Sequence, residues 1–279
     1  MKDRICLITG FTSGIGKATA FGLAGKGATL VLICRDKAKG EEVINEIKNK
    51  TGNSNLHLYI ADLSSQKEIG RVATEIKEQH PVIDVLINNA GGINEKHELT
   101  EDGIELTFAV NHLAYFMLTL LLLDNVKSSG YARIINVASD AHQFSKLDFD
   151  DLNSTNSFNP MKVYGMTKLA NIMFTYEMAR KLNDTHVSVN AMHPGGVNTN
   201  FGKNMKGVAG AYFRLSPFSR KPEKGAETVI WLASSPEVEG VSGKYFMDKK
   251  EKKSNSFSYN KDAQKKLWEE SERMTRVHF

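Results

Sequence analysis

Tyr164 and Lys168 are separated by four positions in the sequence. On a helix this spacing puts both side chains on one face, about one turn apart. A free tyrosine hydroxyl has a pKa of about 10 and is a poor base at neutral pH, but a nearby ammonium favours the phenolate and would lower that pKa. The pair could therefore exchange a proton with an oxygen atom of a small molecule. The spacing alone is a weak indication, because both residue types are common on helix surfaces.

Ser139 and Asn111 are two further polar residues in apolar surroundings. Ser139 follows the apolar run Ile134–Ala138, a predicted strand, and ligands of open α/β folds bind at this carboxyl edge. Its hydroxyl could donate to a carbonyl oxygen on which negative charge develops, although a turn or cap is the alternative role. Asn111 lies inside the uncharged run Leu106–Leu123, where an amide either satisfies a backbone carbonyl or has a function.

A glycine-rich loop follows the first predicted strand, with three glycines in the order Gly-xxx-Gly-x-Gly. Glycine allows the tight turn and the close approach to a pyrophosphate, whose charge sits at a helix N-terminus. A loop without a ligand is the alternative, and the strand before and helix after it favour binding. The expected contacts of this loop with a dinucleotide are Gly10, Thr12, Ser13, Gly14, Ile15 and Gly16.

Arg35 and Asp36 follow the second predicted strand, where the adenosine ribose of a dinucleotide should lie. An acidic residue there holds the ribose hydroxyls of NAD, whereas an arginine accommodates the 2′-phosphate of NADP. Asp36 is also well placed to cap the next helix. Arg35 suits a phosphate dianion, with a solvated surface arginine as its alternative role. We therefore expect NADP(H), with NAD(H) as the less favoured cofactor.

Two more stretches fit the cofactor. Asp62 and Leu63 follow the third predicted strand, where a carboxylate can accept a hydrogen bond from the adenine amino group; Ser64 and Ser65 could instead cap the next helix. After the fourth predicted strand, small residues would let the backbone pass close to the cofactor. The expected contacts here are Asn89, Ala90 and Gly91.

Apolar runs alternate with helical stretches along the whole chain. The predicted strands span Ile5–Thr9, Thr29–Cys34, Leu56–Ile60, Val85–Asn88, Ile134–Ala138, Val187–Met192 and Lys244–Met247. The predicted helices span Gly14–Lys26, Lys37–Lys50, Gln66–Gln79, Leu99–Lys127, Pro160–Leu182, Glu223–Ala233 and Lys261–Val277. Strands that are apolar almost throughout indicate burial on both faces. The pattern predicts an α/β fold in one domain over residues 1–279: a doubly wound, Rossmann-type parallel sheet of about seven strands with helices on both faces. The polar stretch Lys249–Ser258 is expected to be a surface loop.

Composition and charge narrow the function classes. A net charge of +4 over 279 residues, without a basic stripe, disfavours nucleic acid as a partner. Two cysteines, Cys6 and Cys34, are too few for a disulfide framework and read as buried thiols. The run Leu106–Leu123 is nearly long enough to span a bilayer, but Asn111 and His112 interrupt it. We expect a buried helix, no metal site and a soluble, cytoplasmic protein.

In combination these motifs resemble the short-chain dehydrogenase/reductase family. The sequence Asn-Asn-Ala-Gly at 88–91 matches that family's signature letter for letter. Asn111, Ser139, Tyr164 and Lys168 match its catalytic set, in the same order. The turn at 34–36, with Ala141-His142 and Lys168–Asn171, is most similar to NADP-preferring, retinol dehydrogenase-like members. Ala138 departs from the second serine of many relatives, and we expect no counterpart here of the membrane anchor found on several retinol dehydrogenases.

The resemblance implies a reaction and further contacts. Ser139 and Tyr164 would hydrogen-bond a carbonyl, the nicotinamide would give hydride to its carbon, and Tyr164 would donate the proton. Lys168 would orient the cofactor ribose and lower the tyrosine pKa, and Asn111 would hold a water that relays protons. The segment at 194–199 would contact the nicotinamide carboxamide through Pro194, Gly195, Val197 and Thr199. The helix around Leu113–Leu123 and the helix carrying Tyr164 resemble the family's dimer-forming pair, which implies a homodimer or homotetramer.

The substrate is less defined by the sequence. The segment at about 200–220 is expected to be a lid beside the substrate, and its apolar residues favour a lipophilic ketone, aldehyde or alcohol. They could equally pack against the body of the protein. A non-catalytic NADP-binding scaffold or sensor is the rival function, and the intact catalytic set argues against it. Reduction of a carbon–carbon double bond is disfavoured by the presence of both Ser139 and the tyrosine spacing.

Overall fold

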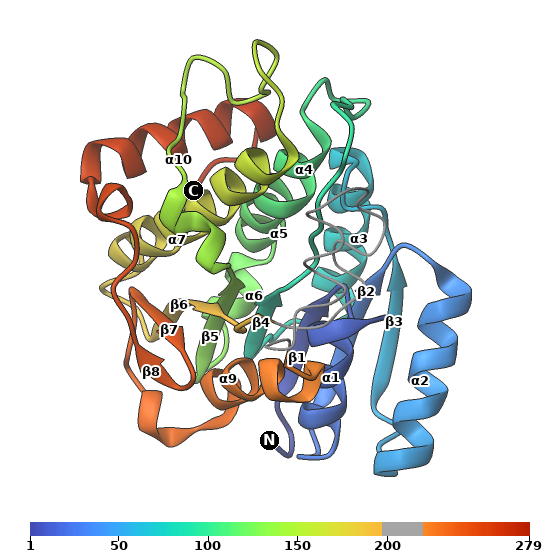
Figure 1. Cartoon of the computed structure of the whole chain (residues 1–279). Coiled ribbons are helices and arrows are strands. Elements are labelled where there is room, and N and C mark those ends of the chain that lie inside the picture. The colour runs from blue at the N-terminus through green and yellow to red at the C-terminus, as the bar shows by residue number, and fades with distance from the viewer. Residues whose placement is uncertain (197–219) are drawn as a thin grey trace.

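A computed structural model of the chain describes residues 1–196 and 220–279. Its centre is an eight-stranded sheet in the order β3-β2-β1-β4-β5-β6-β7-β8 (Figure 1). The strands are β1 (Ile5–Thr9), β2 (Thr29–Cys34), β3 (Leu56–Ile60), β4 (Val85–Asn88), β5 (Ala132–Val137), β6 (Val187–His193), β7 (Lys244–Met247) and β8 (Lys250–Glu251). The seven predicted strands are confirmed and parallel. The eighth, β8, pairs antiparallel with β7 inside the stretch predicted to be a loop.

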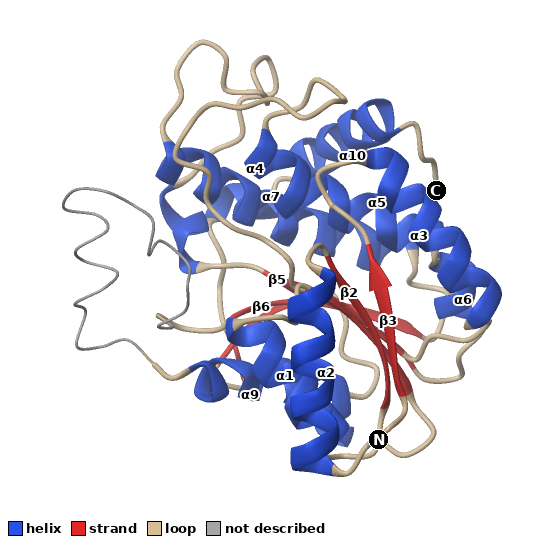
Figure 2. Cartoon of the chain, turned by 90° about the vertical axis from the view of Figure 1, so that its right-hand side faces the viewer, coloured by secondary structure: helices blue, strands red, loops and turns tan. Residues whose placement is uncertain are grey.

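Helices cover both faces of the sheet, as predicted (Figure 2). One face carries α1 (Gly14–Ala24), α2 (Lys37–Thr51) and α9 (Pro222–Ser234); the other carries α3 (Gln66–Gln79), α5 (Ala114–Leu121) and α7 (Pro160–Lys181). Neighbouring residues of β1 show why the strands are apolar throughout. Leu7 packs into the core on the α7 side, whereas Cys6 and Ile8 pack into the core on the α1 side. Cys6 and Cys34 are buried free thiols.

The strand order reverses between β1 and β4, which lie side by side although their paired residues, such as Cys6 and Val85, are 79 positions apart in the sequence. In an open α/β sheet a ligand binds outside the carboxyl ends of the strands at such a switch point. The glycine-rich loop leaves β1 at this edge, and the Asn89–Gly91 segment leaves β4 beside it. The topology therefore brings the predicted cofactor segments to one place.

The long helix predicted over Leu99–Lys127 is wrong in its first part and interrupted in the rest. Gly103 adopts a positive φ of 75°, and residues before Leu106 form a turn. The helix begins with α4 (Leu106–Phe108), passes through a π-helical turn η1 (Ala109–Leu113) into α5, and restarts as α6 (Leu123–Lys127). Both carboxylate oxygens of the buried Glu105 accept hydrogen bonds from the backbone N–H groups of Thr107 and Phe108, which fixes the start.

The C-terminal helix α10 (Lys261–Thr275) packs over α5 and α7. Trp268 of α10 contacts the rings of Phe116 on α5 and Phe174 on α7. In the described part of the chain, α10 thus covers the helix pair for which a dimer contact was expected. A homo-oligomer stays a prediction and would need another surface or a displaced α10. Among the described helices, none has the length and apolarity needed to cross a membrane.

Candidate active site

The glycine-rich loop is too tightly folded to admit side chains at two of its glycines. Gly10 has φ of +69°, and a Cβ there would lie 2.8 Å from the Cα of Ala90. A Cβ on Gly16 would overlap the carbonyl oxygen of Gly10 and the side-chain amide of Asn89. These glycines let the loop after β1 lie directly against the loop after β4.

The start of α1 fits a phosphate. Its N-cap residue, Ser13, has an exposed side chain that makes no capping hydrogen bond. In contrast, Asp36 and Ser65 cap α2 and α3 with their side chains. The first N–H groups of a helix need an acceptor, and their positive end of the helix dipole attracts an anion. A dinucleotide pyrophosphate held by residues 10–16 meets both requirements.

Gly16→Ala is expected to raise the Kd for NADPH at least about tenfold, because the new methyl group must push the loop out of its shape. Fluorescence titration of the folded variant with NADPH measures this Kd. Gly70→Ala in α3 is the matched control, since a Cβ at Gly70 meets no atom within 4 Å. An unchanged Kd in Gly16→Ala would remove the loop from the cofactor site.

The loop after β4 is held against the end of β1 by hydrogen bonds. The Thr9 hydroxyl accepts from the backbone N–H groups of Asn89 and Ala90, both at 2.9 Å. In return, the Asn89 side chain donates to the carbonyl oxygens of Thr9 and Gly10. Asn88, one residue earlier, points into the protein and donates to Thr119 and Asn136. The two asparagines of this motif therefore shape the site, and the chain past them can lie along a cofactor.

At the end of β2, Arg35 and Asp36 separate into different roles. The Asp36 carboxylate accepts from the backbone N–H of Lys39 at 3.1 Å, which lowers the pKa of Asp36 and confirms it as the cap of α2. The Arg35 side chain is exposed directly after β2, the strand next to β1 in the sheet. The guanidinium of Arg35 is therefore available to an anion, whereas the carboxylate of Asp36 is used to cap α2.

Asp62 and Leu63 follow β3, next to β2 in the sheet. The Asp62 carboxylate accepts hydrogen bonds from the backbone and the hydroxyl of Ser64, at 2.9 and 2.8 Å. Its side chain is half-buried, and Ser65 caps α3 as predicted. Because β2 and β3 are parallel neighbours, the turn after β3 lies at the same edge of the sheet as Arg35.

Asn111 lies in the π-helical turn and is completely buried. Its side-chain oxygen accepts from the N–H of Gly92, and its amide donates to the Gly92 carbonyl and the Thr167 hydroxyl. Its backbone carbonyl accepts from the Asn171 amide at 2.9 Å. The side chain thus ties the loop after β4 to α7, which explains a polar residue inside an apolar run.

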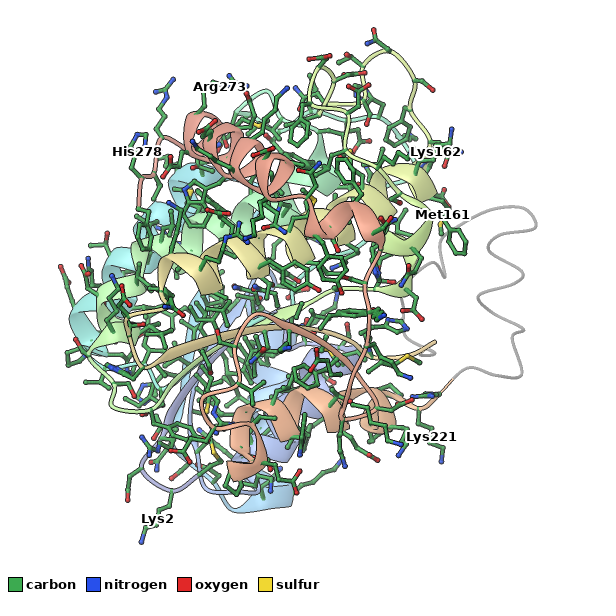
Figure 3. All side chains as sticks on the ribbon, turned by 90° about the vertical axis from the view of Figure 1, so that its left-hand side faces the viewer. Lys2, Met161, Lys162, Lys221, Arg273 and His278 are labelled. Atoms are coloured by element: carbon green, nitrogen blue, oxygen red, sulfur yellow. The ribbon has the colours of Figure 1, made fainter. Side chains whose placement is uncertain are left out.

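Ser139, Tyr164 and Lys168 come together at the carboxyl end of β5. Figure 3 labels Met161 and Lys162 in the first turn of α7. Tyr164 and Lys168 follow in the next turns of this helix. The Tyr164 hydroxyl is hydrogen-bonded to Ser139. The Lys168 ammonium donates to the carbonyl oxygen of Val137 at 3.0 Å. Three of the predicted residues therefore surround one point at the sheet edge.

Burial controls the proton affinities of this pair. It raises the pKa of Tyr164 to about 12, against the opposing effect of the Ser139 hydrogen bond. It lowers the pKa of Lys168 to about 7, because the buried ammonium has lost its water. The expected lowering of the tyrosine pKa by the lysine is not found in the chain alone.

Sequence reasoning missed a group of residues directly after Ser139. Asp140 accepts from the Tyr245 hydroxyl at 2.9 Å and pairs with the His193 imidazole at 3.2 Å. The hydrogen bond with His193 lowers the pKa of Asp140. The buried His142 contacts the Ser139 carbonyl through Nδ1 at 2.6 Å. These contacts join β6 and β7 to the turn that carries Ser139. They cannot be predicted from a short sequence motif.

Pro194 and Gly195 follow β6 at the same sheet edge, and Gly195 has a φ of +83°. Val197 and Thr199, the other two predicted contacts of this segment, lie outside the described residues, as does nearly all of the expected lid at 200–220. Among the described residues, no group of three or more histidine, cysteine, aspartate or glutamate side chains could hold a metal ion.

Similarity to known proteins covers nearly the whole chain. Residues 4–207 match the family model for short chain dehydrogenases. Human retinol dehydrogenase 14 is 41% identical over 291 residues, covering 98% of this chain and 87% of that protein. Human polyprenol dehydrogenase is 37% identical over 283 residues, covering 99% and 86%.

Solved structures agree with the fold. An uncharacterized protein from Mycobacterium paratuberculosis aligns with a TM-score of 0.81 and 27% identity, covering 100% of this chain and 95% of that one. A protein from Beutenbergia cavernae, named for an NAD(P)-dependent gluconate 5-dehydrogenase and recorded with NADP bound at low occupancy, has a TM-score of 0.72 and 25% identity, covering 88% and 95%. With the site geometry and these matches, the chain belongs to the short-chain dehydrogenase family and is similar to its retinol dehydrogenases.

Proposed function

We propose that this oxidoreductase interconverts a carbonyl and an alcohol on a lipophilic small molecule, with NADP(H) as cofactor and Tyr164 as the general acid and base. The observation that carries the proposal is the meeting of Ser139, Tyr164 and Lys168 at the carboxyl end of β5, next to the loop that fits a pyrophosphate. A protein that only binds a nucleotide needs no buried tyrosine and lysine there.

Each residue has a step that its contacts support. When bound, the reduced nicotinamide supplies a hydride to the carbonyl carbon. The Ser139 hydroxyl donates a hydrogen bond to the carbonyl oxygen as negative charge develops on it. Tyr164, protonated because of its raised pKa, gives its proton to that oxygen and completes the alcohol. In the oxidative direction the tyrosine takes the proton back while the hydride leaves the carbon.

Lys168 and Asn111 act behind the tyrosine. The Lys168 ammonium lies within reach of a cofactor ribose that follows the loop after β4, since a Cβ on Gly91 would be 3.5 Å from its Nζ. Its charge favours the phenolate that remains after proton transfer. Asn111 holds Gly92 against α7 and so keeps that loop at a fixed distance from Lys168. In this proposal the asparagine side chain is a clamp, and a relay water would have to share its backbone carbonyl with Asn171.

The NADP preference rests on Arg35. Arg35→Ala is expected to lower kcat/KM for NADPH about tenfold or more and to leave that for NADH nearly unchanged, because only NADPH carries the 2′-phosphate. Steady-state kinetics with both cofactors measures the ratio. Lys48→Ala, which removes a cation from the far end of α2, is the matched control for net charge. A higher efficiency with NADH in the unmodified enzyme would overturn the assignment.

The lipophilic substrate is supported by the names of two relatives, which refer to retinol and polyprenol. The test is NADPH consumption with a panel that pairs retinal and a prenyl aldehyde with polar carbonyls such as a sugar aldehyde. We expect turnover of the apolar members and little of the polar ones. Turnover of the polar members alone would overturn the substrate class. Tight NADPH binding without turnover of any carbonyl would favour a nucleotide-binding scaffold instead.

A further inference from the structure

Tyr115 is a buried aromatic residue next to the site that the proposed mechanism does not use. It lies on α5, one helical turn after Asn111, and is 1% exposed. Its hydroxyl has no hydrogen-bond partner in the described part of the chain. The position of its ring is therefore set by packing, and a phenylalanine could keep that position without burying an unsatisfied hydroxyl.

The Lys168 ammonium lies over the faces of two aromatic rings. Its Nζ is 5.5 Å from the ring centroid of Tyr115 and 5.6 Å from that of Tyr164. Both distances are within the range of a cation–π contact, which is strongest where the cation is desolvated. Lys168 is 3% exposed, and its Nζ donates a hydrogen bond to the carbonyl oxygen of Val137.

Among the described residues, the groups near the Lys168 ammonium carry no negative charge. Tyr115 stands on α5 and Tyr164 on α7, and a Cβ on Gly91 would lie 3.5 Å from Nζ and 2.8 Å from the neutral side-chain oxygen of Asn111. Burial is the sole cause of the lowered pKa of Lys168, so no described carboxylate helps to keep the ammonium charged. In the described part of the chain, the ammonium is stabilised by two ring faces and the carbonyl oxygen of Val137.

We propose that Tyr115 is a positioning residue for Lys168: the face of its ring, together with that of Tyr164, holds the Lys168 ammonium against the end of β5. The role rests on the proposed function, in which the charged lysine supports proton transfer by Tyr164. It extends the Tyr164–Lys168 pair on one helix to a three-residue cluster that spans α5 and α7. The contribution comes from the ring, so the hydroxyl of Tyr115 is dispensable.

The test compares Tyr115→Leu with Tyr115→Phe. Without the ring, the ammonium loses stabilisation, and the pKa of Lys168 is expected to fall by about one unit; with phenylalanine it should stay within about 0.3 units. The readout is an NMR titration of ¹³Cε-labelled lysines in the cofactor-free protein, with the Lys168 signal assigned by its loss in Lys168→Arg. A near-ultraviolet circular dichroism spectrum confirms the fold of each variant. If Tyr115→Leu does not fold, Tyr115→Met keeps more of the volume and serves in its place.

A second readout is the pH profile of carbonyl reduction. Because the charged lysine is lost at lower pH in Tyr115→Leu, the fall of kcat on the alkaline side should move to lower pH by the same amount. An unchanged Lys168 titration in a folded Tyr115→Leu would overturn the proposal, and so would an equal shift in Tyr115→Phe, which would assign the effect to the hydroxyl. A wild-type protein without carbonyl turnover would sink the proposed function, while the titration would still decide the role of Tyr115.

Discussion

Tyr164→Phe is expected to lower kcat for carbonyl reduction by about a thousandfold, within the range of roughly 10² to 10⁴ typical of a lost general acid. Phenylalanine fills the same buried space but has no proton to give to the developing alkoxide. Its Kd for NADPH should stay close to that of the unmodified protein, because the loop at 10–16 and Arg35 are untouched. Stopped-flow measurement of NADPH oxidation under single-turnover conditions separates the chemical step from binding.

The matched control is Tyr176→Phe on the same helix. Tyr176 is buried as Tyr164 is and lies about three helical turns after it, and its hydroxyl is hydrogen-bonded to Ser254. Both variants lose one buried hydroxyl, so a shared loss of stability cancels in the comparison. Equal loss of kcat in the two variants, or full turnover by Tyr164→Phe, would show that Tyr164 is not the proton donor.

The strands of this fold were predictable because burial on both faces leaves a plain signal. The predicted bounds of β1 to β4 and of β7 agree with the structure. In contrast, the stretch from Leu99 to Lys127 is apolar over most of its length, and composition does not reveal where its hydrogen bonds change. The positive φ of Gly103, the cap by Glu105 and the π-helical turn at Asn111 depend on contacts with α7 and neighbouring loops. Such local changes of pattern cannot be read from hydrophobic spacing.

The site was predictable where a residue acts through its own type, and less so where it acts through distant partners. Ser139, Tyr164 and Lys168 could be named because chemistry demands those side chains. Asp140 was missed because its partners, His193 and Tyr245, are 53 and 105 positions away. The direction of the pKa shift of Tyr164 also could not be predicted from the sequence. The ammonium four residues away would lower this pKa, but burial raises it, and only the structure shows that burial is the larger effect.

His112 should make the protein lose about 3 kcal/mol of its free energy of unfolding as the pH falls from 6.5 to 4. This histidine is fully buried between the Asn171 side chain, 3.2 Å from Nδ1, and the Ser271 hydroxyl, 3.0 Å from Nε2. Burial lowers its pKa to about 4, while the Asn171 hydrogen bond opposes that shift. The unfolded chain binds a proton below about pH 6.5 and the folded chain only below about 4. Between pH 6.5 and 4 the unfolded state binds more protons than the folded state. The free energy of unfolding therefore decreases as the pH falls through this range.

Urea unfolding of His112→Gln at several pH values tests this expectation. The variant should be less stable than the unmodified protein at pH 7.5, because glutamine cannot reach both partners as imidazole does. From pH 7 to 4.5 it should lose about 2 kcal/mol less, since the buried titrating group is gone. His186→Gln is the matched control, because the side chain of His186 is exposed. A parallel loss in all three proteins would mean that His112 is not held neutral. A smaller loss confined to His112→Gln would show that His112 is held uncharged behind the active site, between Ser271 of α10 and Asn171, whose amide donates to the Asn111 carbonyl.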